Sequence, residues 1–362
     1  MQAFIRHLQR LAREEPPKIA LTEGTRQLTY AQLWEATSAI GAYLASQGLG
    51  SGARLGFLRS ALMPAYLVVI ACLRAGVNVV YLDIRDNPEK SRKIFAHAKI
   101  DLLLSDITPP VEARPTHCPA RKLPETLPPA LDWNPPVVPP SQAAWIEPTS
   151  GSTGVPKLVQ VSRATLGHYL ALQTKKSRLS PDDRVAVLNE MWLDVTLSGL
   201  NAGASVHLFD LRKHGVRDLA QWLRDERIST LQTFLAAFRS VADALSEPLP
   251  ELKKVKLAGE AMTRADVIAF SRVCPKEAVL MNFYGSTELS FISQHDYRHG
   301  APLPQSILPV GKPVDGTEIQ ILDDAGLPVL PGVSGRIRVI ASHMAEAYLD
   351  DPDRSKGVYA TT

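Results

Sequence analysis

The sequence predicts an α/β protein, with mostly parallel layered sheets, flanking helices and a small β lobe. The main observation is an alternation of apolar, strand-like runs with amphipathic, helix-like stretches in the second half of the chain. The runs are Val185–Leu188, Val206–Phe209, Thr230–Phe234, Val255–Ala258 and Ala278–Met281. Because strand–helix–strand alternation produces neighbouring parallel strands, we expect a sheet with helices on its faces. Such sheets bind ligands beyond the carboxyl ends of their strands.

Amphipathic helices are expected in both halves of the chain. Between the last four runs the apolar helical positions are Leu219/Trp222/Leu223, Phe238/Val241/Leu245 and Val267/Phe270, the last pair behind the cap Thr263. Near the N-terminus, residues 29–32 form a capping box, followed by a helix that should stop at Gly48. Two further apolar runs, Val68–Leu73 and Val77–Leu82, are of the buried type.

Proline and the periodicity of the last residues suggest how the chain is divided. Eleven of the 28 prolines lie between Pro109 and Pro140, so this segment reads as an extended surface connector, with docking of a partner as the alternative. Period-two alternation at 317–322 and 335–340, around a turn at 323–326, predicts an antiparallel β lobe. We therefore expect lobes at 1–140, 141–308 and 309–362.

Composition excludes several classes of protein. The net charge is only +3 and no run of five Lys or Arg occurs, which argues against a nucleic-acid partner. The apolar stretch Met63–Leu73 is far shorter than a membrane span, and the first residues do not form a signal peptide. Cys72, Cys118 and Cys274 have no CxxC spacing, which rules out a cysteine-based zinc site. We expect a cytoplasmic protein without a membrane contact.

The strongest chemical signal is the segment Thr-Ser-Gly-Ser-Thr-Gly-Val-Pro-Lys at 149–157. Its small residues leave backbone amides and hydroxyls free to converge on phosphate oxygens, and Lys157 adds a positive charge. It lacks the Gly-Lys-Ser/Thr ending of a Walker A loop. A flexible Gly/Ser loop is the alternative, but such linkers seldom end in Val-Pro-Lys and run into an apolar strand.

This segment resembles the phosphate loop of the adenylate-forming superfamily, which contains acyl-CoA synthetases, adenylation domains of nonribosomal peptide synthetases, and luciferases. Five companion motifs complete the family's order, two before the loop and three after it: Leu28–Leu33, Leu73–Asp83, Leu257–Glu260, Asn282–Glu288, and Gly335–Ala341 together with Ala347–Leu349. The resemblance covers nearly the whole chain, and six motifs in one order are very improbable by chance. It implies the large N-terminal subdomain of that family.

The resemblance implies a nucleotide site for ATP and Mg²⁺. It assigns phosphate contacts to Thr149, Ser150, Gly151, Ser152, Thr153, Gly154, Lys157 and Thr287, and the metal to Glu288. It assigns the adenine surroundings to Gly259, Glu260, Ala261, Asn282, Phe283, Tyr284, Gly285 and Ser286. Thr287, Glu288 and Lys157 would be the catalytic set. A hard cation between phosphates and a carboxylate fits Mg²⁺.

The implied reaction is attack of a substrate carboxylate on the α-phosphorus of ATP, which gives an acyl-adenylate and pyrophosphate. Catalysis then rests on positioning and neutralisation of charge, without a nucleophilic side chain. The family's acceptor is a phosphopantetheine thiol of a carrier protein, or CoA. The absence of a histidine between His168 and His207 favours the carrier protein.

The substrate is expected to be a small or unusual amino acid. In amino-acid-activating relatives an aspartate pairs with the substrate ammonium, and two ways of counting place either Asp194 or Glu190 at that position. Leu257, Met281 and Phe283 are further pocket candidates, and their bulk leaves room only for a small side chain. The alternatives are an aryl or fatty acyl-CoA or acyl-AMP ligase, and a non-catalytic nucleotide-binding protein.

Three features depart from the family's pattern. Leu158 stands where the family usually has glycine, and Arg163 stands where a histidine is often found. The sequence ends at Thr362, before the aspartate that binds the ribose hydroxyls in the family and before its C-terminal subdomain with a catalytic lysine. We therefore expect that this chain is the core of a longer protein and that it adenylates poorly when isolated.

Overall fold

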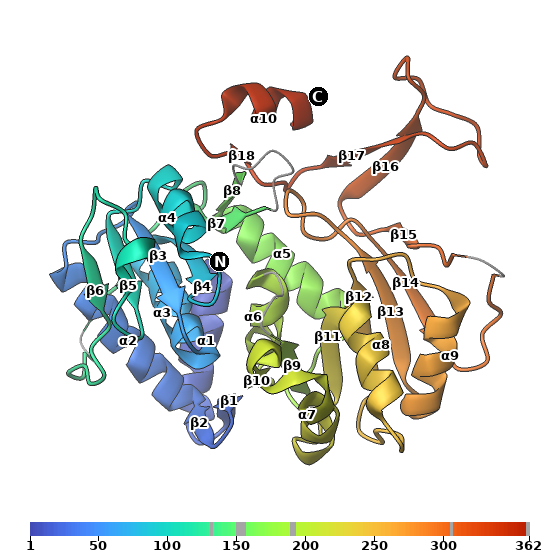
Figure 1. Cartoon of the computed structure of the whole chain (residues 1–362), viewed down its shortest axis with the longest axis horizontal. Helices are drawn as coiled ribbons and strands as arrows, with labels where there is room; N and C mark the ends of the chain where they lie inside the picture. Colours follow the sequence, from blue (N-terminus) through green and yellow to red (C-terminus); the bar gives the residue numbers. More distant parts are fainter. Residues whose placement is uncertain (131–132, 150–156, 189–192, 305–306, 360–362) are drawn as a thin grey trace.

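Two large sheets and the helices packed between them form the body of the protein (Figure 1). The structure is a computed structural model, and it describes residues 1–130, 133–149, 157–188, 193–304 and 307–359. Among the described residues, no helix combines the length and the apolar character that crossing a membrane requires. The mostly parallel sheets with flanking helices confirm the predicted fold class.

The first sheet has seven strands in the order β18-β8-β7-β4-β3-β5-β6. Strands β4, β3, β5 and β6 run parallel, whereas β8 is antiparallel to both β7 and β18. The bounds are β3 (Arg54–Arg59), β4 (Asn78–Asp83), β5 (Leu102–Ser105), β6 (Ala120–Lys122), β7 (Ala143–Pro148), β8 (Leu158–Ser162) and β18 (Ala347–Tyr348). The phosphate-loop segment thus connects the antiparallel pair β7 and β8.

The second sheet has nine strands in the order β15-β14-β13-β12-β11-β9-β10-β1-β2. All neighbours from β13 to β1 are parallel, and the two edges are closed by antiparallel strands. The bounds are β1 (Ile19–Glu23), β2 (Arg26–Thr29), β9 (Arg184–Leu188), β10 (Ser205–Phe209), β11 (Thr230–Phe234), β12 (Lys254–Ala258), β13 (Val279–Tyr284), β14 (Ser293–Arg298) and β15 (Lys312–Pro313). Each of the five predicted runs therefore falls on a strand.

Helices occupy three layers around these sheets. The largest hydrophobic cluster joins residues of α1 (Gln2–Glu14), α2 (Tyr30–Ser46), α3 (Leu62–Ala75), α5 (Arg163–Lys176) and α6 (Leu193–Asn201) to both sheets. A second cluster holds α7 (Leu211–Asp225), α8 (Leu235–Ala244) and α9 (Arg264–Val273) against the outer face of the nine-stranded sheet. A third packs α4 (Pro88–His97) and the 3₁₀ turn η1 (Val111–Ala113) on the seven-stranded sheet. A last helix, α10 (Pro352–Val358), follows β18.

The helix α2 begins as its sequence predicts. The backbone N–H of Gln32 donates to Thr29 Oγ1 at 3.2 Å, and the Thr29 N–H donates to Gln32 Oε1 at 2.9 Å. This reciprocal pair satisfies amide groups that the first helical turn leaves without partners. By contrast, the run Val68–Leu73 lies inside α3, where twelve of fourteen residues are buried. An apolar run of this kind does not distinguish a buried helix from a strand.

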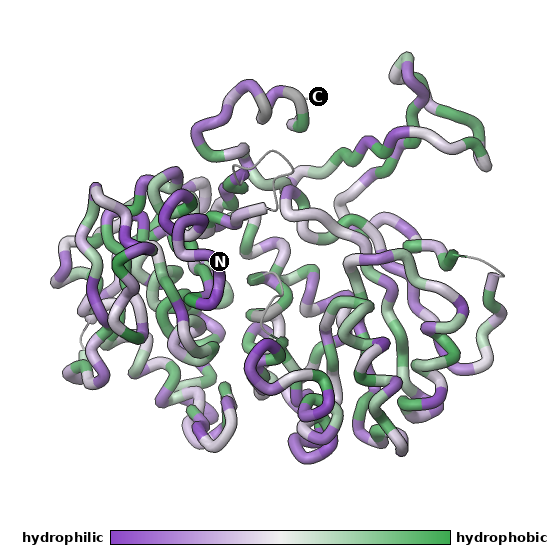
Figure 2. Tube along the Cα trace, in the orientation of Figure 1, coloured by the Kyte–Doolittle hydropathy of each residue, from purple (hydrophilic) through white to green (hydrophobic). Residues whose placement is uncertain are grey.

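Hydropathy follows the layers. In Figure 2 the outer helix α7 is largely hydrophilic, whereas the strands of the parallel sheet are predominantly hydrophobic. Helices cover both sides of the sheet, so the polar residues of its strands, such as His207, Gln232 and Lys256, are buried as well.

Each of the two large sheets contains strands from both sides of the lobe boundary that we expected at residue 140. Strands β1 and β2 join the second sheet, although β3 to β6 belong to the first. Strands β7 and β8 then return to the first sheet. Similarly, only β16 (Thr317–Leu322) and β17 (Arg336–Ala341) form a separate antiparallel sheet, while β15 and β18 complete the large ones. In Figure 1 this β16–β17 hairpin extends away from the body of the molecule at the upper right.

The proline-rich segment 109–140 is attached to the core rather than only passing over it. It contains η1 and β6, and β6 extends the seven-stranded sheet next to β5. Its Trp133 side chain lies against Gly41 of α2, where an added Cβ would come within 2.2 Å of the indole. The guanidinium of Arg74 lies between Trp34 and Trp133, at 3.5 and 5.1 Å from their ring centroids.

Candidate functional site

The ends of the predicted phosphate loop are held together. Strand β7 leads into Thr149, and β8 begins directly after Lys157. The Thr149 N–H donates to the carbonyl oxygen of Lys157 at 2.8 Å, which closes the base of the loop. The predicted contacts of Ser150, Gly151, Ser152, Thr153 and Gly154 lie outside the described residues, so their phosphate roles stay predictions.

The second motif begins in the last three residues of β13 and continues into a sharp turn. A Cβ added to Gly285 would lie 1.7 Å from the carbonyl oxygen of Ser290, so only glycine permits this approach. The Ile292 N–H donates to the carbonyl of Tyr284 at 2.9 Å and closes the turn. Ser290 itself has a φ of 44°, an uncommon conformation for a residue with a side chain. Ser286 and Thr287 of this turn line a small cavity together with Glu147 of β7.

Tyr348 of β18 joins the two motifs. Its hydroxyl donates to Glu288 Oε1 at 2.5 Å, and its ring centroid lies 5.1 Å from Lys157 Nζ. The Ala345 N–H also donates to the Glu288 carbonyl oxygen at 2.9 Å. The described residues Lys157 and Glu288 of the two segments thus both lie next to Tyr348. That they grip a nucleotide together stays a prediction.

A small cavity of about 10 Å³ lies beside these motifs. Its described walls come from β7, β8, α5, the first turn of α6 and the loop after β13. The lining residues are Trp145, Glu147, Val161, Leu166, Tyr169, Leu193, Asp194, Ser286, Thr287 and Ser290. We call it the acid pocket, since two carboxyl groups face it.

Asp194 is one of these carboxyl groups and lies in the first turn of α6. Only 3% of its surface is exposed, and its Oδ2 accepts from Ser290 Oγ at 2.5 Å and from Gln173 Nε2 at 3.0 Å. Burial raises the pKa of Asp194, while the two donors and the nearby Lys256 charge act in the opposite direction. The competing candidate, Glu190, lies outside the described residues.

Glu147 is the second carboxyl group, and the sequence analysis missed it. It stands at the end of β7, two residues before the phosphate-loop segment, and accepts from Trp145 Nε1 at 3.4 Å. Burial raises its pKa to about 8, and the negative charges of Asp194 and Glu288 contribute. A glutamate inside an otherwise apolar strand, directly before a glycine-rich loop, was the signal available in the sequence.

Lys256 lies behind Asp194 and was also missed. Its Nζ donates to Gln173 Oε1 and, at 3.2 Å, to Ser177 Oγ. The rings of Phe283 and Phe291 lie 4.5 and 4.0 Å away. Burial lowers the pKa of Lys256 to about 7, although Asp194 and Asp296 favour its charged form.

This arrangement corrects the expectation for Leu257. Side chains alternate along a strand, so the neighbours Lys256 and Ala258 face the inner helices, while Leu257 packs into the cluster of α8 and α9. Phe283 shares the inner face, and its ring makes a T-shaped contact with Phe291, with 4.7 Å between the ring centroids. Met281 is fully buried and lies opposite Lys256 in the sheet register. None of the three predicted bulky residues is among the described walls of the acid pocket.

The residues predicted to surround adenine lie directly after β12, in the last residues of β13 and directly after β13. Gly259, with φ +97°, Glu260 and Ala261 are exposed, and the Glu260 carboxylate pairs with Arg239 at 2.9 Å. Tyr284 is partly buried, which leaves part of its ring accessible. The Asn282 side chain is buried and donates through Nδ2 to the carbonyl of Pro309 at 3.0 Å, so this donor already has a partner.

The residues present fit a magnesium ion held together with phosphate oxygens. Among the described residues, no group of three or more His, Cys, Asp and Glu side chains is arranged as a metal cage. Mg²⁺ typically takes one or two carboxylates and completes its shell with water and substrate phosphates. Glu288, partly exposed and next to Thr287, is a donor of this kind.

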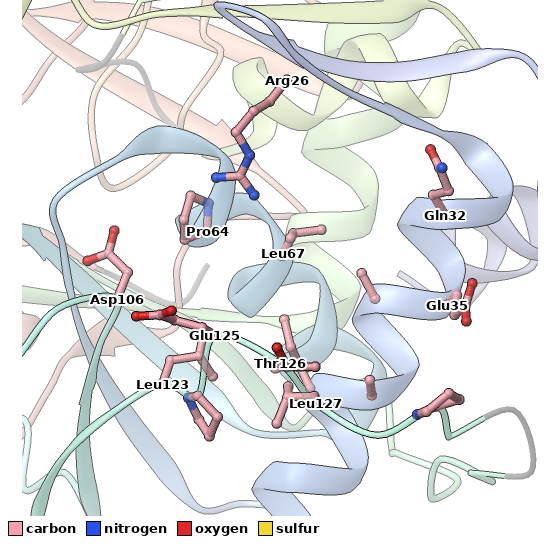
Figure 3. Close-up of a pocket in the computed structure, with 15 residues that line it drawn as sticks. Arg26, Gln32, Glu35, Pro64, Leu67, Asp106, Leu123, Glu125, Thr126 and Leu127 are labelled. Atoms are coloured by element: carbon pink, nitrogen blue, oxygen red, sulfur yellow. The ribbon is translucent and has the colours of Figure 1, made fainter.

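Larger cavities lie elsewhere in the fold. One of about 580 Å³ is bordered by α2, α3 and the proline-rich segment, with Leu67, Leu123 and Leu127 among its walls (Figure 3). None of the predicted site residues lines it. Its size therefore gives no reason to move the candidate site away from the two motifs.

Comparisons with known proteins agree with this geometry. The chain is 27% identical to syringomycin synthase SyrB1 of Pseudomonas syringae pv. syringae, over 94% of this chain and 57% of that protein. It is 28% identical to an L-proline--[L-prolyl-carrier protein] ligase of Streptomyces coelicolor, over 87% of this chain and 65% of the ligase. The chain thus spans less than two thirds of the length of these curated relatives.

Solved structures show the same fold. The N-terminal subdomain of NpsA from Klebsiella oxytoca, in complex with 3-hydroxybenzoyl-AMSN, superposes with a TM-score of 0.82 at 20% identity. The superposition covers 99% of this chain and 92% of that one. Residues 8–349 match the family described as AMP-binding enzyme. This match covers nearly the whole chain, and Lys157 and Glu288 of the two motifs both lie next to Tyr348. The protein therefore belongs to the AMP-binding enzyme family.

Proposed function

We propose that this chain binds MgATP between segments 149–157 and 282–288 and activates the carboxylate of a small amino acid. The carboxylate attacks the α-phosphorus of ATP, and pyrophosphate leaves, so that an aminoacyl-adenylate forms. The observation that carries the proposal is the position of Tyr348, which brings Glu288 and Lys157 together beside a pocket with buried Asp194.

The roles follow from charge and position. Lys157 would neutralise phosphate charge as a point cation, and the Thr287 hydroxyl would donate to a phosphate oxygen. Glu288 would hold Mg²⁺, which supplies charge neutralisation between the phosphates when bound. Tyr348 donates to Glu288 and so orients its carboxylate for this task. Such a site lowers the barrier by positioning and electrostatics alone.

An amino acid is favoured as the substrate because the acid pocket contains two carboxyl groups, Asp194 and Glu147. An ammonium group offers three donors and a positive charge, which would compensate the burial of these carboxylates. The Streptomyces ligase acts, by its name, on L-proline and a carrier protein. We propose the same class of acceptor here, a phosphopantetheine thiol of a carrier protein, and infer a cytoplasmic location because the reaction consumes ATP.

ATP–pyrophosphate exchange with amino acids and their deamino analogues tests this function. We expect amino-acid-dependent exchange, measured both with this chain alone and with a C-terminal subdomain of the family added. Asp194→Asn should raise the KM for the amino acid by about tenfold or more, with the KM for ATP little changed.

Two results would contradict the proposal. Exchange driven equally well by acids without an amine would identify an aryl or fatty acyl ligase instead. Binding of ATP without exchange for any acid, even with the C-terminal subdomain present, would identify a non-catalytic nucleotide-binding protein.

A further inference from the structure

Lys256 is an unusual residue for its surroundings. It lies in the middle of β12, in the centre of the nine-stranded sheet, and only 2% of its surface is exposed. Withdrawing an ammonium group from water costs free energy unless hydrogen bonds and an opposite charge compensate it. The compensation here comes from Gln173, Ser177, two aromatic faces and the charge of Asp194.

The contacts of Gln173 fix the orientation of its side-chain amide. Lys256 is only a donor, so it must meet the amide oxygen, and the Asp194 carboxylate is an acceptor, so it must meet the amide nitrogen. Both conditions are satisfied by one orientation of the amide. If Lys256 were absent, the amide could rotate and place its oxygen against the carboxylate of Asp194.

We propose that Lys256 is a positioning residue for substrate recognition: through Gln173 it holds Asp194 in the orientation that receives the ammonium group of the amino acid. This inference rests on the proposed function, and it identifies the residue that holds Asp194 in place at the ammonium site. Lys256 acts indirectly, because it is absent from the described walls of the acid pocket whereas Asp194 forms part of them. Ser290 holds the same Asp194 oxygen from the opposite motif.

The charge of Lys256 supports the same role. Asp194 is buried, and burial favours its neutral form, which would bind an ammonium group weakly. The charge of Lys256, behind Gln173, opposes this rise in the pKa of Asp194, and Lys256 does so without lining the pocket. The rings of Phe283 and Phe291 cover this cation, so a ligand in the pocket would meet Asp194 first.

Binding of two adenylate analogues tests the proposal without requiring turnover. The probes are alanyl-sulfamoyladenosine, which carries an ammonium group, and propionyl-sulfamoyladenosine, which is the same molecule without it. Isothermal titration with the full chain gives the ratio of their affinities. Lys256→Met should lower this ratio by about tenfold, because a hydrogen bond to a charged group is worth about this factor. The affinity for the propionyl compound should stay within about twofold of the wild type, which shows that the variant is folded.

Two further variants distinguish positioning from a structural role. Gln173→Met breaks the link while Lys256 remains, and should lower the ratio similarly, while the double variant should add little to either change because the residues act as one unit. Lys254→Met is the matched control: it removes a lysine from the same strand whose Nζ contacts Asp183 instead, and the ratio should not change.

The outcomes separate this inference from the proposed function. A wild-type chain that binds both analogues equally well overturns the amino-acid assignment and, with it, the role of Lys256. A wild-type preference for the alanyl compound that persists in Lys256→Met overturns the role of Lys256 alone. A ratio that rises in Lys256→Met also overturns it, because Lys256 would then compete with the ligand for Asp194.

Discussion

Replacing Glu147 with glutamine should change how the stability of the protein depends on pH. In the folded protein the pKa of Glu147 is raised from 4.5 to about 8. Between these values the folded state keeps a proton that the unfolded state has lost, so stability falls as the pH rises. Glutamine resembles the protonated carboxyl group and has no such loss.

The size of the effect follows from the change in pKa. A rise from 4.5 to about 8 corresponds to at most about 5 kcal/mol, at about 1.4 kcal/mol per pH unit. Glu147 keeps part of its surface exposed, so screening by water reduces this value, and we expect about 2 kcal/mol. Glu147→Gln should match the wild type at about pH 5 and be more stable by that amount at about pH 8.5.

Urea unfolding followed by circular dichroism at several pH values measures this difference directly. Glu125→Gln is the control, because Glu125 is exposed and its partner Lys122 lowers its pKa, away from the range tested. A difference between Glu147→Gln and the wild type that stays constant with pH would refute the reasoning. It would mean that Glu147 is ionised in the folded protein and already has a compensating partner.

Two further predictions concern the junction of the motifs. Tyr348→Phe removes the hydrogen bond to Glu288 and should lower the free energy of unfolding by about 1 kcal/mol; an unchanged urea midpoint would argue against this bond. Gly285→Ala should destabilise the protein by about 1–3 kcal/mol, because its Cβ would overlap the Ser290 carbonyl, and it should weaken ATP binding by moving the loop. Gly50→Ala, where the Cβ would meet open space, is the control in thermal unfolding, and equal losses in both variants would count against the steric argument.

The order of the parallel elements could be predicted from the sequence because each buried strand is a short segment rich in apolar and β-branched residues, set between helical stretches. The expected run Thr230–Phe234 coincides with β11, and Thr317–Leu322 coincides with β16. That the two motifs lie near each other could also be predicted from the sequence. Segment 282–288 follows a strand of the parallel sheet, and ligand sites of such sheets form at these strand ends.

Two properties of the site could not be predicted, and the reason is physical. Lys254 and Lys256 alternate with Val255 and Leu257 along β12, but helices cover both faces of this strand, so the alternation does not indicate which face borders the site. The hydrogen-bond partners of Lys256, Gln173 in α5 and Ser177 at its C-terminal cap, lie 83 and 79 residues earlier in the chain. Their proximity arises only from the packing of α5 on the sheet.

The exchange of strands between the two sheets has a consequence for how the chain folds. Because β1 and β2 complete one sheet before β3 to β6 begin the other, neither sheet corresponds to an uninterrupted piece of the polypeptide. If the gene were divided near residue 140, the β1–β2 hairpin of the first fragment would lack the sheet that it normally joins. In the second fragment, β10 would lose its partner β1 and become an exposed edge strand. Closing contacts across such long intervals slows folding, so the two sheets must assemble together rather than in succession.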